Sequence, residues 1–298
     1  MWPSSSSGVG TTPTSADATG PQQAGVIGSP IAHSLSPTLH RAAYAALGLT
    51  GWRYHREEVR AGELAAYLAG RPADWIGLSV TMPGKQEALA AADTASDVAR
   101  LSGSANTLLR AGQGWVADNT DVYGIRASLL EAGCVPDSAR RAIVVGSGAT
   151  ARSTLVALHG LGVGEIVLVV RGQARSETLE LTRSLGLDCR VAGLDEEVDG
   201  APVDLAVSTV PADAAPGAGA VPRSWQAAAG AAVALDVVYQ PWPTPWARHL
   251  LASGTTVVAG VELLTHQAAQ QVELMTGRAA PLEAMRDSVR MEPREPVR

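Results

Sequence analysis

A single lysine, Lys85, stands among the 23 basic residues of the chain, and the other 22 are arginines. Arginine keeps its charge under all physiological conditions, whereas a lysine ammonium can release a proton. A sequence that uses arginine wherever a fixed charge suffices, yet keeps one lysine, suggests a site that needs a transferable proton. The alternative is a chance lysine on a solvated loop, and the count alone does not separate the two.

Hydroxyl, amide and carboxylate side chains gather in four short segments on either side of this lysine. The segments are residues 28–37 (GSPIAHSLSP), 79–85 (SVTMPGK), 103–108 (GSANTL) and 118–124 (DNTDVYG). Such groups can hold a polar, hydroxyl-rich ligand, and the carboxylate of Asp121 could orient the ammonium of Lys85. The simpler interpretation of Asp121, and of Ser36 before Pro37, is a helix N-cap.

A glycine-rich turn lies in the middle of the chain, between a predicted strand at residues 141–145 and a predicted helix. It consists of Gly146, Ser147, Gly148, Ala149, Thr150 and Ala151. The first glycine permits a tight turn, the second lets the backbone approach a pyrophosphate, and Ala151 allows close helix–strand packing. The helix N-terminus favours the phosphate charge. In this context the turn predicts a dinucleotide site rather than a plain structural turn.

The next predicted strand, residues 166–170, indicates which dinucleotide is bound. Sites for NAD usually place an acidic residue at the end of this strand, where it holds the ribose 2′-hydroxyl. Here the strand runs into Arg171 and Arg175, which suit a 2′-phosphate. The sequence therefore predicts NADP (NADPH), the alternative being two solvated surface arginines.

Strand-like and helix-like segments alternate along most of the chain, which predicts an α/β protein with parallel sheets. We expect a disordered tail at residues 1–23 and a loose end at 291–298. Between them we expect two domains with a cleft between them: an α/β substrate-binding domain (24–122 with 259–290) and a Rossmann-type NADP-binding domain (123–258). Strands are expected at 24–28, 75–80, 142–145, 166–170, 189–192, 205–208, 233–237 and 256–258, with an irregular strand at 52–59 and a hairpin formed by 106–110 and 115–117. Helices are expected at 36–47, 62–68, 86–92, 149–159, 176–185, 245–251, 262–275 and 282–289, and a further helix is expected to run through Ile125 and Leu129 to Gly133.

Composition excludes several other classes of protein. The net charge of −6 argues against a nucleic-acid partner, and no apolar run approaches the ~18 residues that span a membrane. The first 23 residues lack the basic and apolar regions of a signal peptide, so we expect a soluble, cytoplasmic protein. Cys134 and Cys189 form no metal or redox motif, and no metal is expected.

From residue 25 to about 290 the chain resembles the shikimate dehydrogenase family, because the four segments and the glycine-rich turn occur in that family's order. The resemblance implies that Lys85 and Asp121 are catalytic. It implies substrate binding by Ser34, Ser36, Thr81, Asn106, Tyr239 and Gln267. It implies contacts with the cofactor from the glycine-rich turn, Arg171, Arg175, Ser208, Thr209, Val210 and Gly260.

The chain departs from the family's pattern at a few positions. Ser79 replaces an asparagine, Arg41 replaces the asparagine that usually follows His40, and Glu262 stands where a small residue is common. His266 is interpreted as a packing or surface histidine. The departures at Ser79 and Glu262 leave the breadth of substrates open.

The resemblance implies reversible reduction of 3-dehydroshikimate to shikimate by NADPH, with Lys85 as acid/base and Asp121 as its partner, in aromatic amino-acid biosynthesis. One alternative is a quinate/shikimate dehydrogenase that uses NAD, or a paralogue acting on a related cyclitol acid. An alternative of another class is a non-catalytic NADP-binding protein. Family members are often homodimers, although no interface pattern is evident in the sequence.

Overall fold

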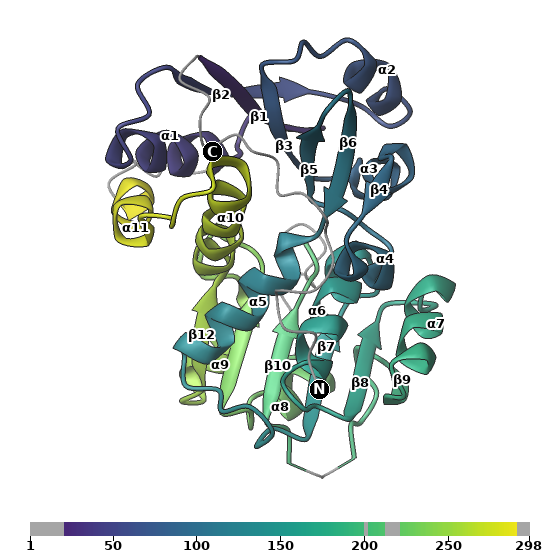
Figure 1. The fold of residues 1–298 in the computed structure, drawn as a ribbon. Helices are drawn as coiled ribbons and strands as arrows, with labels where there is room; N and C mark the ends of the chain where they lie inside the picture. Colours follow the sequence, from purple (N-terminus) through teal and green to yellow (C-terminus); the bar gives the residue numbers. More distant parts are fainter. Residues whose placement is uncertain (1–20, 200–201, 212–220, 291–298) are drawn as a thin grey trace. The chain divides into compact units, whose positions relative to one another are not determined.

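The computed structural model describes residues 21–199, 202–211 and 221–290 (Figure 1). Among these, residues 21–120 and 267–290 form one compact unit, and residues 121–266 form a second. None of the helices in the described ranges is long and apolar enough to cross a membrane. Two helices run from one unit into the other: α5 (Thr120–Glu131) and α10 (Gly260–Thr276).

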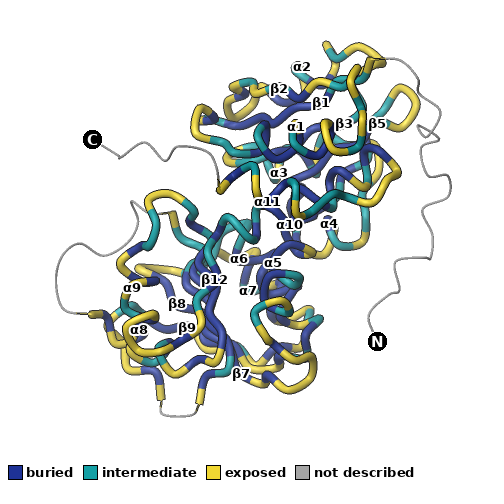
Figure 2. Tube along the Cα trace, turned by 90° about the vertical axis from the view of Figure 1, so that its left-hand side faces the viewer, coloured by how far each residue is buried: buried dark blue, intermediate teal, exposed yellow. Residues whose placement is uncertain are grey.

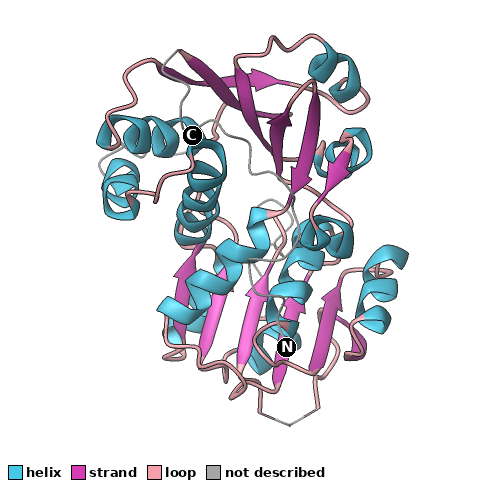
Figure 3. Cartoon of the chain, in the orientation of Figure 1, coloured by secondary structure: helices cyan, strands magenta, loops and turns pink. Residues whose placement is uncertain are grey.

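The first unit is built on a six-stranded mixed sheet, in the order β2-β1-β3-β5-β6-β4 (Figure 3). Its strands are β1 (Gln22–Gly28), β2 (Trp52–Glu58), β3 (Trp75–Val80), β4 (Thr94–Ala95), β5 (Thr107–Ala111) and β6 (Gly114–Asp118). Its other helices are α1 (Ser36–Ala46), α2 (Leu64–Ala69), α3 (Lys85–Ala91), α4 (Asp97–Ser102) and α11 (Leu282–Arg290). β5 is antiparallel to β3, and it is also antiparallel to β6, to which a tight hairpin joins it.

The second unit is a parallel six-stranded sheet in the order β12-β11-β10-β7-β8-β9. Its strands are β7 (Arg141–Val145), β8 (Glu165–Val170), β9 (Asp188–Gly193), β10 (Leu205–Ser208), β11 (Val233–Asp236) and β12 (Thr256–Ala259), and its helices include α6 (Ala149–His159), α7 (Ser176–Ser184), α8 (Arg223–Ala228) and α9 (Pro245–Ala252). β7 and β8 are buried along almost their whole length, as Figure 2 shows. This order is the doubly wound arrangement, whose ligands bind where the chain leaves the carboxyl ends of the strands.

The predicted strand at 75–80 and the predicted helix at 149–159 match β3 and α6 to the residue. Several other predictions were wrong. The expectation of parallel sheets fails for the first unit, whose mixed sheet contains the predicted hairpin of 106–110 with 115–117 as β5 and β6. The elements β4, α4 and α8 were missed because two to six residues are too few to show a hydrophobic period. The predicted tail ends too late, since Gln22 and Gln23 pair with β2. Residues 1–20 and 291–298 lie outside the described residues.

Ser36 was predicted as the N-cap of the first helix, and this was wrong. It is the first helical residue of α1, and the cap position belongs to Leu35, which makes no side-chain cap hydrogen bond. The Ser36 backbone N–H instead donates to Ser34 Oγ at 3.3 Å. Ser34 thus takes over part of the capping role, and the buried Ser36 side chain is hydrogen-bonded to Tyr54.

A buried polar network runs through the first unit from His40 on α1 to Gln271 on α10. His40 is fully buried and stacks on Tyr54, and its Nε2 donates to Gln271 Oε1 at 3.3 Å. Ser79 Oγ donates to the same oxygen at 2.7 Å and lies 2.5 Å from the Tyr54 hydroxyl. With its proton committed to Gln271, Ser79 accepts from Tyr54. The Ser79 hydroxyl therefore acts both as a donor and as an acceptor, at a position where the family that the chain resembles usually has an amide.

We expect His40 to make the protein less stable in acid. Burial lowers the pKa of His40 from 6.5 to about 3, so between those values the unfolded chain binds a proton that the folded chain excludes. The contribution of His40 to stability is complete above pH 6.5 and is lost as the pH falls through this window. Between pH 7 and pH 5 the loss should be about 2 kcal/mol. Urea unfolding of the wild type and of His40→Gln at both pH values measures it, and equal losses in the two proteins would contradict the assignment.

Candidate functional site

Asn106 organises the polar groups of the first unit. Its Oδ1 accepts from the backbone N–H of Thr120 at 2.8 Å and from the hydroxyls of Thr107 and Thr120 at 2.8 and 3.1 Å. With Oδ1 occupied as an acceptor, Nδ2 donates to Gln267 Oε1 at 3.1 Å. The structure therefore brings together two residues predicted to bind substrate, although 161 positions separate them in the sequence.

Lys85 and Thr81 lie at the two ends of the turn that follows β3. The turn is closed by the Gly84 N–H donating to Thr81 O at 3.0 Å, and Lys85 then begins α3. The Lys85 carbonyl accepts from the Ala105 N–H at 2.8 Å, which ties the start of α3 to the segment that carries Asn106. Both side chains are half-buried. The lysine therefore has a fixed backbone, and the residue as a whole is partly accessible.

Two further predicted residues belong to the second unit. Asp121 is buried, with 7% of its surface exposed, and follows Thr120 in the first turn of α5. Tyr239 is half-buried and comes three residues after the end of β11. Asp121 and Lys85 belong to different units, so their pairing stays a prediction.

The glycine-rich turn of the second unit has the geometry that a dinucleotide site needs. Gly146 has φ +109°, and a Cβ there would lie 2.5 Å from Thr209 Oγ1. Gly148 is the N-cap of α6, and a Cβ on it would meet no atom within 4 Å. The positive φ and the close approach of Thr209 thus require glycine at position 146. Gly148 leaves open space before the helix N-terminus, where phosphate oxygens are favoured.

Hydrogen bonds attach both neighbouring loops to this turn. Thr209 Oγ1 donates to Val145 O at 2.7 Å, which holds the loop after β10 against the end of β7. The Arg175 N–H donates to Ser147 Oγ at 3.3 Å, and Thr178 Oγ1 donates to Ser147 O at 2.7 Å. The loop that carries the two arginines is therefore anchored to the glycine-rich turn, while the arginine side chains remain exposed.

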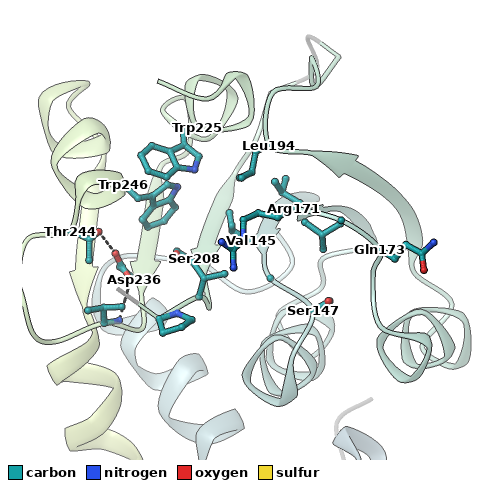
Figure 4. A pocket seen from close by; sticks show the side chains of 17 residues that line it. Val145, Ser147, Arg171, Gln173, Leu194, Ser208, Trp225, Asp236, Thr244 and Trp246 are labelled. Carbon is teal, nitrogen blue, oxygen red and sulfur yellow. Dashed lines mark hydrogen bonds between the residues drawn. The ribbon is translucent and has the colours of Figure 1, made fainter. Parts of the chain in front are cut away.

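A cavity of about 240 Å³ opens at the carboxyl ends of these strands, as Figure 4 shows. Its lining includes Gly146, Ser147, Arg171, Ser208 and Val210, all predicted to contact the cofactor. Trp225 and Trp246 lie next to each other in its wall. Its backbone amides and its guanidinium group suit phosphates, and the tryptophans and valines suit a flat ring. The residues present therefore fit a dinucleotide.

Asp236, at the end of β11, supplies a buried carboxyl group to this cavity. Its burial raises the pKa to about 6, and hydrogen bonds from the Thr244 hydroxyl at 2.5 Å and the Val238 N–H at 3.1 Å oppose that rise. The Thr244 hydroxyl also accepts from the Ala247 N–H and so caps α9. The carboxyl group thus fixes the loop between β11 and α9, the segment that contains Tyr239.

Sequence reasoning missed several residues of these sites. Thr120 and Gln271 both contact the Asn106 segment, and Gln271 lies one helical turn after Gln267 on α10. That four-residue spacing was the available signal, because it places both amides on one face of a helix. Trp225 and Trp246 carried no signal, since isolated tryptophans on short helices are ordinary core residues.

Comparisons with known proteins identify the family to which the chain belongs. The family model described as the shikimate dehydrogenase substrate binding domain matches residues 26–108, and the one described as the shikimate 5′-dehydrogenase C-terminal domain matches residues 260–290. A curated protein from Thermosynechococcus vestitus named shikimate dehydrogenase (NADP(+)) is 32% identical over 268 residues, which cover 89% of this chain and 93% of that protein.

Solved structures show the same relationship. Mycobacterium tuberculosis shikimate dehydrogenase is 42% identical with a TM-score of 0.80, over 91% of this chain and 100% of that one. Shikimate 5-dehydrogenase from Thermus thermophilus, solved in complex with NADP(H) and shikimate, is 29% identical with a TM-score of 0.77, over 90% of this chain and 98% of that one. The fold is therefore that of an α/β substrate-binding domain with a Rossmann nucleotide-binding domain, and the chain belongs to the shikimate dehydrogenase family.

Proposed function

We propose that this protein is an NADP-dependent shikimate dehydrogenase that interconverts 3-dehydroshikimate and shikimate. The observation that carries the proposal is that this chain has both a polar substrate site and a dinucleotide site. One unit has hydroxyl and amide groups held around Asn106, and the other has a glycine-rich turn with two arginines. The curated relative's name and the Thermus thermophilus complex support the choice of substrate and cofactor.

In this proposal the residues of the first unit hold the substrate. The hydroxyls of Ser34 and Ser36 bind its carboxylate at the start of α1, where a helix N-terminus favours an anion. Asn106 and Gln267 bind ring hydroxyls. Their side chains are held in place by their hydrogen bond to each other and by the bond from the Thr120 backbone N–H to Asn106. Thr81 contributes a further hydroxyl, and Tyr239 contributes one from the second unit. Rigid donors of this kind lose little entropy on binding.

Lys85 is the acid/base in this proposal. Bound NADPH supplies the hydride, and negative charge then develops on the carbonyl oxygen of the substrate. An ammonium group beside that oxygen stabilises the charge and delivers the proton, and in the reverse direction the amine removes it. Asp121 orients the ammonium group as its carboxylate partner.

The proposal is tested by the absorbance of NADPH formed from NADP⁺ and shikimate, with NAD⁺ and quinate assayed in parallel. We expect turnover with shikimate and NADP⁺. Turnover of quinate or use of NAD⁺ would instead indicate the broader quinate/shikimate relative. Binding of NADPH without turnover of any pair would leave a non-catalytic NADP-binding protein.

We expect Arg171→Ala and Arg175→Ala each to weaken NADPH binding by about tenfold to a hundredfold, the cost of a lost hydrogen bond to a charged group. Binding of NADH should hardly change, because it lacks the 2′-phosphate. Titration calorimetry with both nucleotides measures the difference. Arg183→Ala, an exposed change on α7, is the matched control. Equal losses for NADPH and NADH would contradict the assignment of these arginines to the 2′-phosphate.

A cytoplasmic location and a homodimer are also part of the proposal. Both rest on the family relationship. Sedimentation of the purified protein would test the dimer, and fractionation of the source cells would test the location.

A further inference from the structure

Three groups that commonly bind metal ions converge in the second unit. Glu131 is the last residue of α5, and Glu262 and His266 lie one helical turn apart near the start of α10. One carboxylate oxygen of each glutamate and one ring nitrogen of the histidine lie within 4.8 Å of one another. His266 Nε2 donates to Glu131 Oε2 at 2.7 Å. Among the residues that the structure describes, this is the one such convergence.

The arrangement is close to what one bound ion requires. Two ligand atoms that share an ion lie at most about 4.4 Å apart, which is twice a typical zinc–oxygen or zinc–nitrogen bond. The side chain of Glu131 is half-exposed and can rotate, whereas that of His266 is 9% exposed and held in place. A shift of one glutamate oxygen by a few tenths of an ångström would bring all three atoms within reach of a single ion. The exposed side of the cluster is open to water, which would complete the coordination.

We propose that Glu131, Glu262 and His266 form a binding site for a divalent transition-metal ion of the zinc class. The imidazole nitrogen selects zinc-like ions over magnesium, which prefers oxygen ligands and dehydrates reluctantly. The two carboxylates supply the negative charge that offsets the ion. The ion would bind Nε2 in place of the hydrogen that His266 now donates to Glu131, and the neutral imidazole would then carry its proton on Nδ1.

The site is independent of the proposed dehydrogenase function. None of its three residues is assigned there to substrate, to cofactor or to proton transfer. The proposal also gives a role to two residues that the family resemblance does not explain. These are Glu262, which stands where a small residue is common, and His266, which has no proposed part in the reaction. A metal ion joining α5 to α10 would stabilise the second unit, because anything that binds only the folded chain shifts the unfolding equilibrium.

Titration calorimetry of tag-free, chelator-treated protein with zinc chloride tests the proposal. We expect one zinc ion per chain, and binding at least about tenfold weaker in both Glu262→Gln and His266→Asn, since loss of a ligand should cost no less than loss of an outer-shell partner. Glu273→Gln on α10 and His159→Asn on α6 are the matched controls and should bind zinc like the wild type. Magnesium chloride should bind at least about tenfold more weakly than zinc.

Two further readouts locate the ion. Zinc should raise the melting temperature of the wild type and of Glu273→Gln but not of Glu262→Gln, which leaves the His266–Glu131 contact intact and so should fold normally. The visible spectrum of bound cobalt should show no thiolate charge-transfer band. Such a band would place the ion on Cys134 or Cys189 and overturn the proposal. Equal zinc affinity in the wild type and in Glu262→Gln would overturn it as well.

Discussion

Lys85→Ala should lower kcat/KM for shikimate by about a thousandfold or more while NADPH binding stays unchanged. General acid/base catalysis contributes about 10²–10⁴-fold, and a charge aimed at a developing oxyanion contributes a comparable factor. Alanine removes both. The backbone should stay in place, because it is the Lys85 carbonyl that accepts the hydrogen bond from Ala105. Steady-state absorbance kinetics and calorimetry with NADPH measure the two quantities.

Lys85→Arg separates the two roles of the lysine. Arginine keeps a positive charge but does not release its proton near neutral pH, so it should recover little of the lost rate. Gln86→Ala is the matched control, since it changes the next, exposed residue of α3 and should leave the rate unchanged. If Lys85→Arg turned over shikimate at close to the wild-type rate, the proton-transfer role would be wrong and only the charge would matter.

Gly260→Ala should have the largest effect on the stability of the second unit. A Cβ at this position would overlap the carbonyl group of Val237 and lie 2.8 Å from the carbonyl carbon of Val238. These are backbone atoms of the two residues that follow β11, and they cannot rotate away as a side chain could. Overpacking of a core costs about 1–3 kcal/mol, and a clash between backbones should fall at or above the upper limit. Urea unfolding measures the loss.

Gly148→Ala is the informative comparison for this prediction. A Cβ there meets nothing within 4 Å, so stability should change little. Binding of NADPH should weaken, because the added methyl group occupies the space proposed for the pyrophosphate. Normal stability of Gly260→Ala would show that the start of α10 can move away from β11. Unchanged NADPH affinity in Gly148→Ala would argue against the pyrophosphate position.

Local sequence rules were sufficient for the elements that carry the cofactor groups. A short apolar run predicts the strand β7, and a helical period predicts the helix α6. The glycines between them predict the turn, where Gly146 has a positive φ. Each of these signals acts within a few residues. The same is true of Lys85, whose position after a buried strand and a proline turn is visible in the sequence. These features are local, because their free energies depend on near neighbours.

Tertiary structure alone decided which distant groups meet. The contact of Asn106 with Gln267, the burial of His40 beneath α10, and the placement of two tryptophans in the wall of the cavity all depend on how strands pair and helices pack. So does the convergence of Glu131 with Glu262 and His266. No local rule encodes such contacts, because the free energy that holds them comes from burial and pairing between segments up to 231 residues apart.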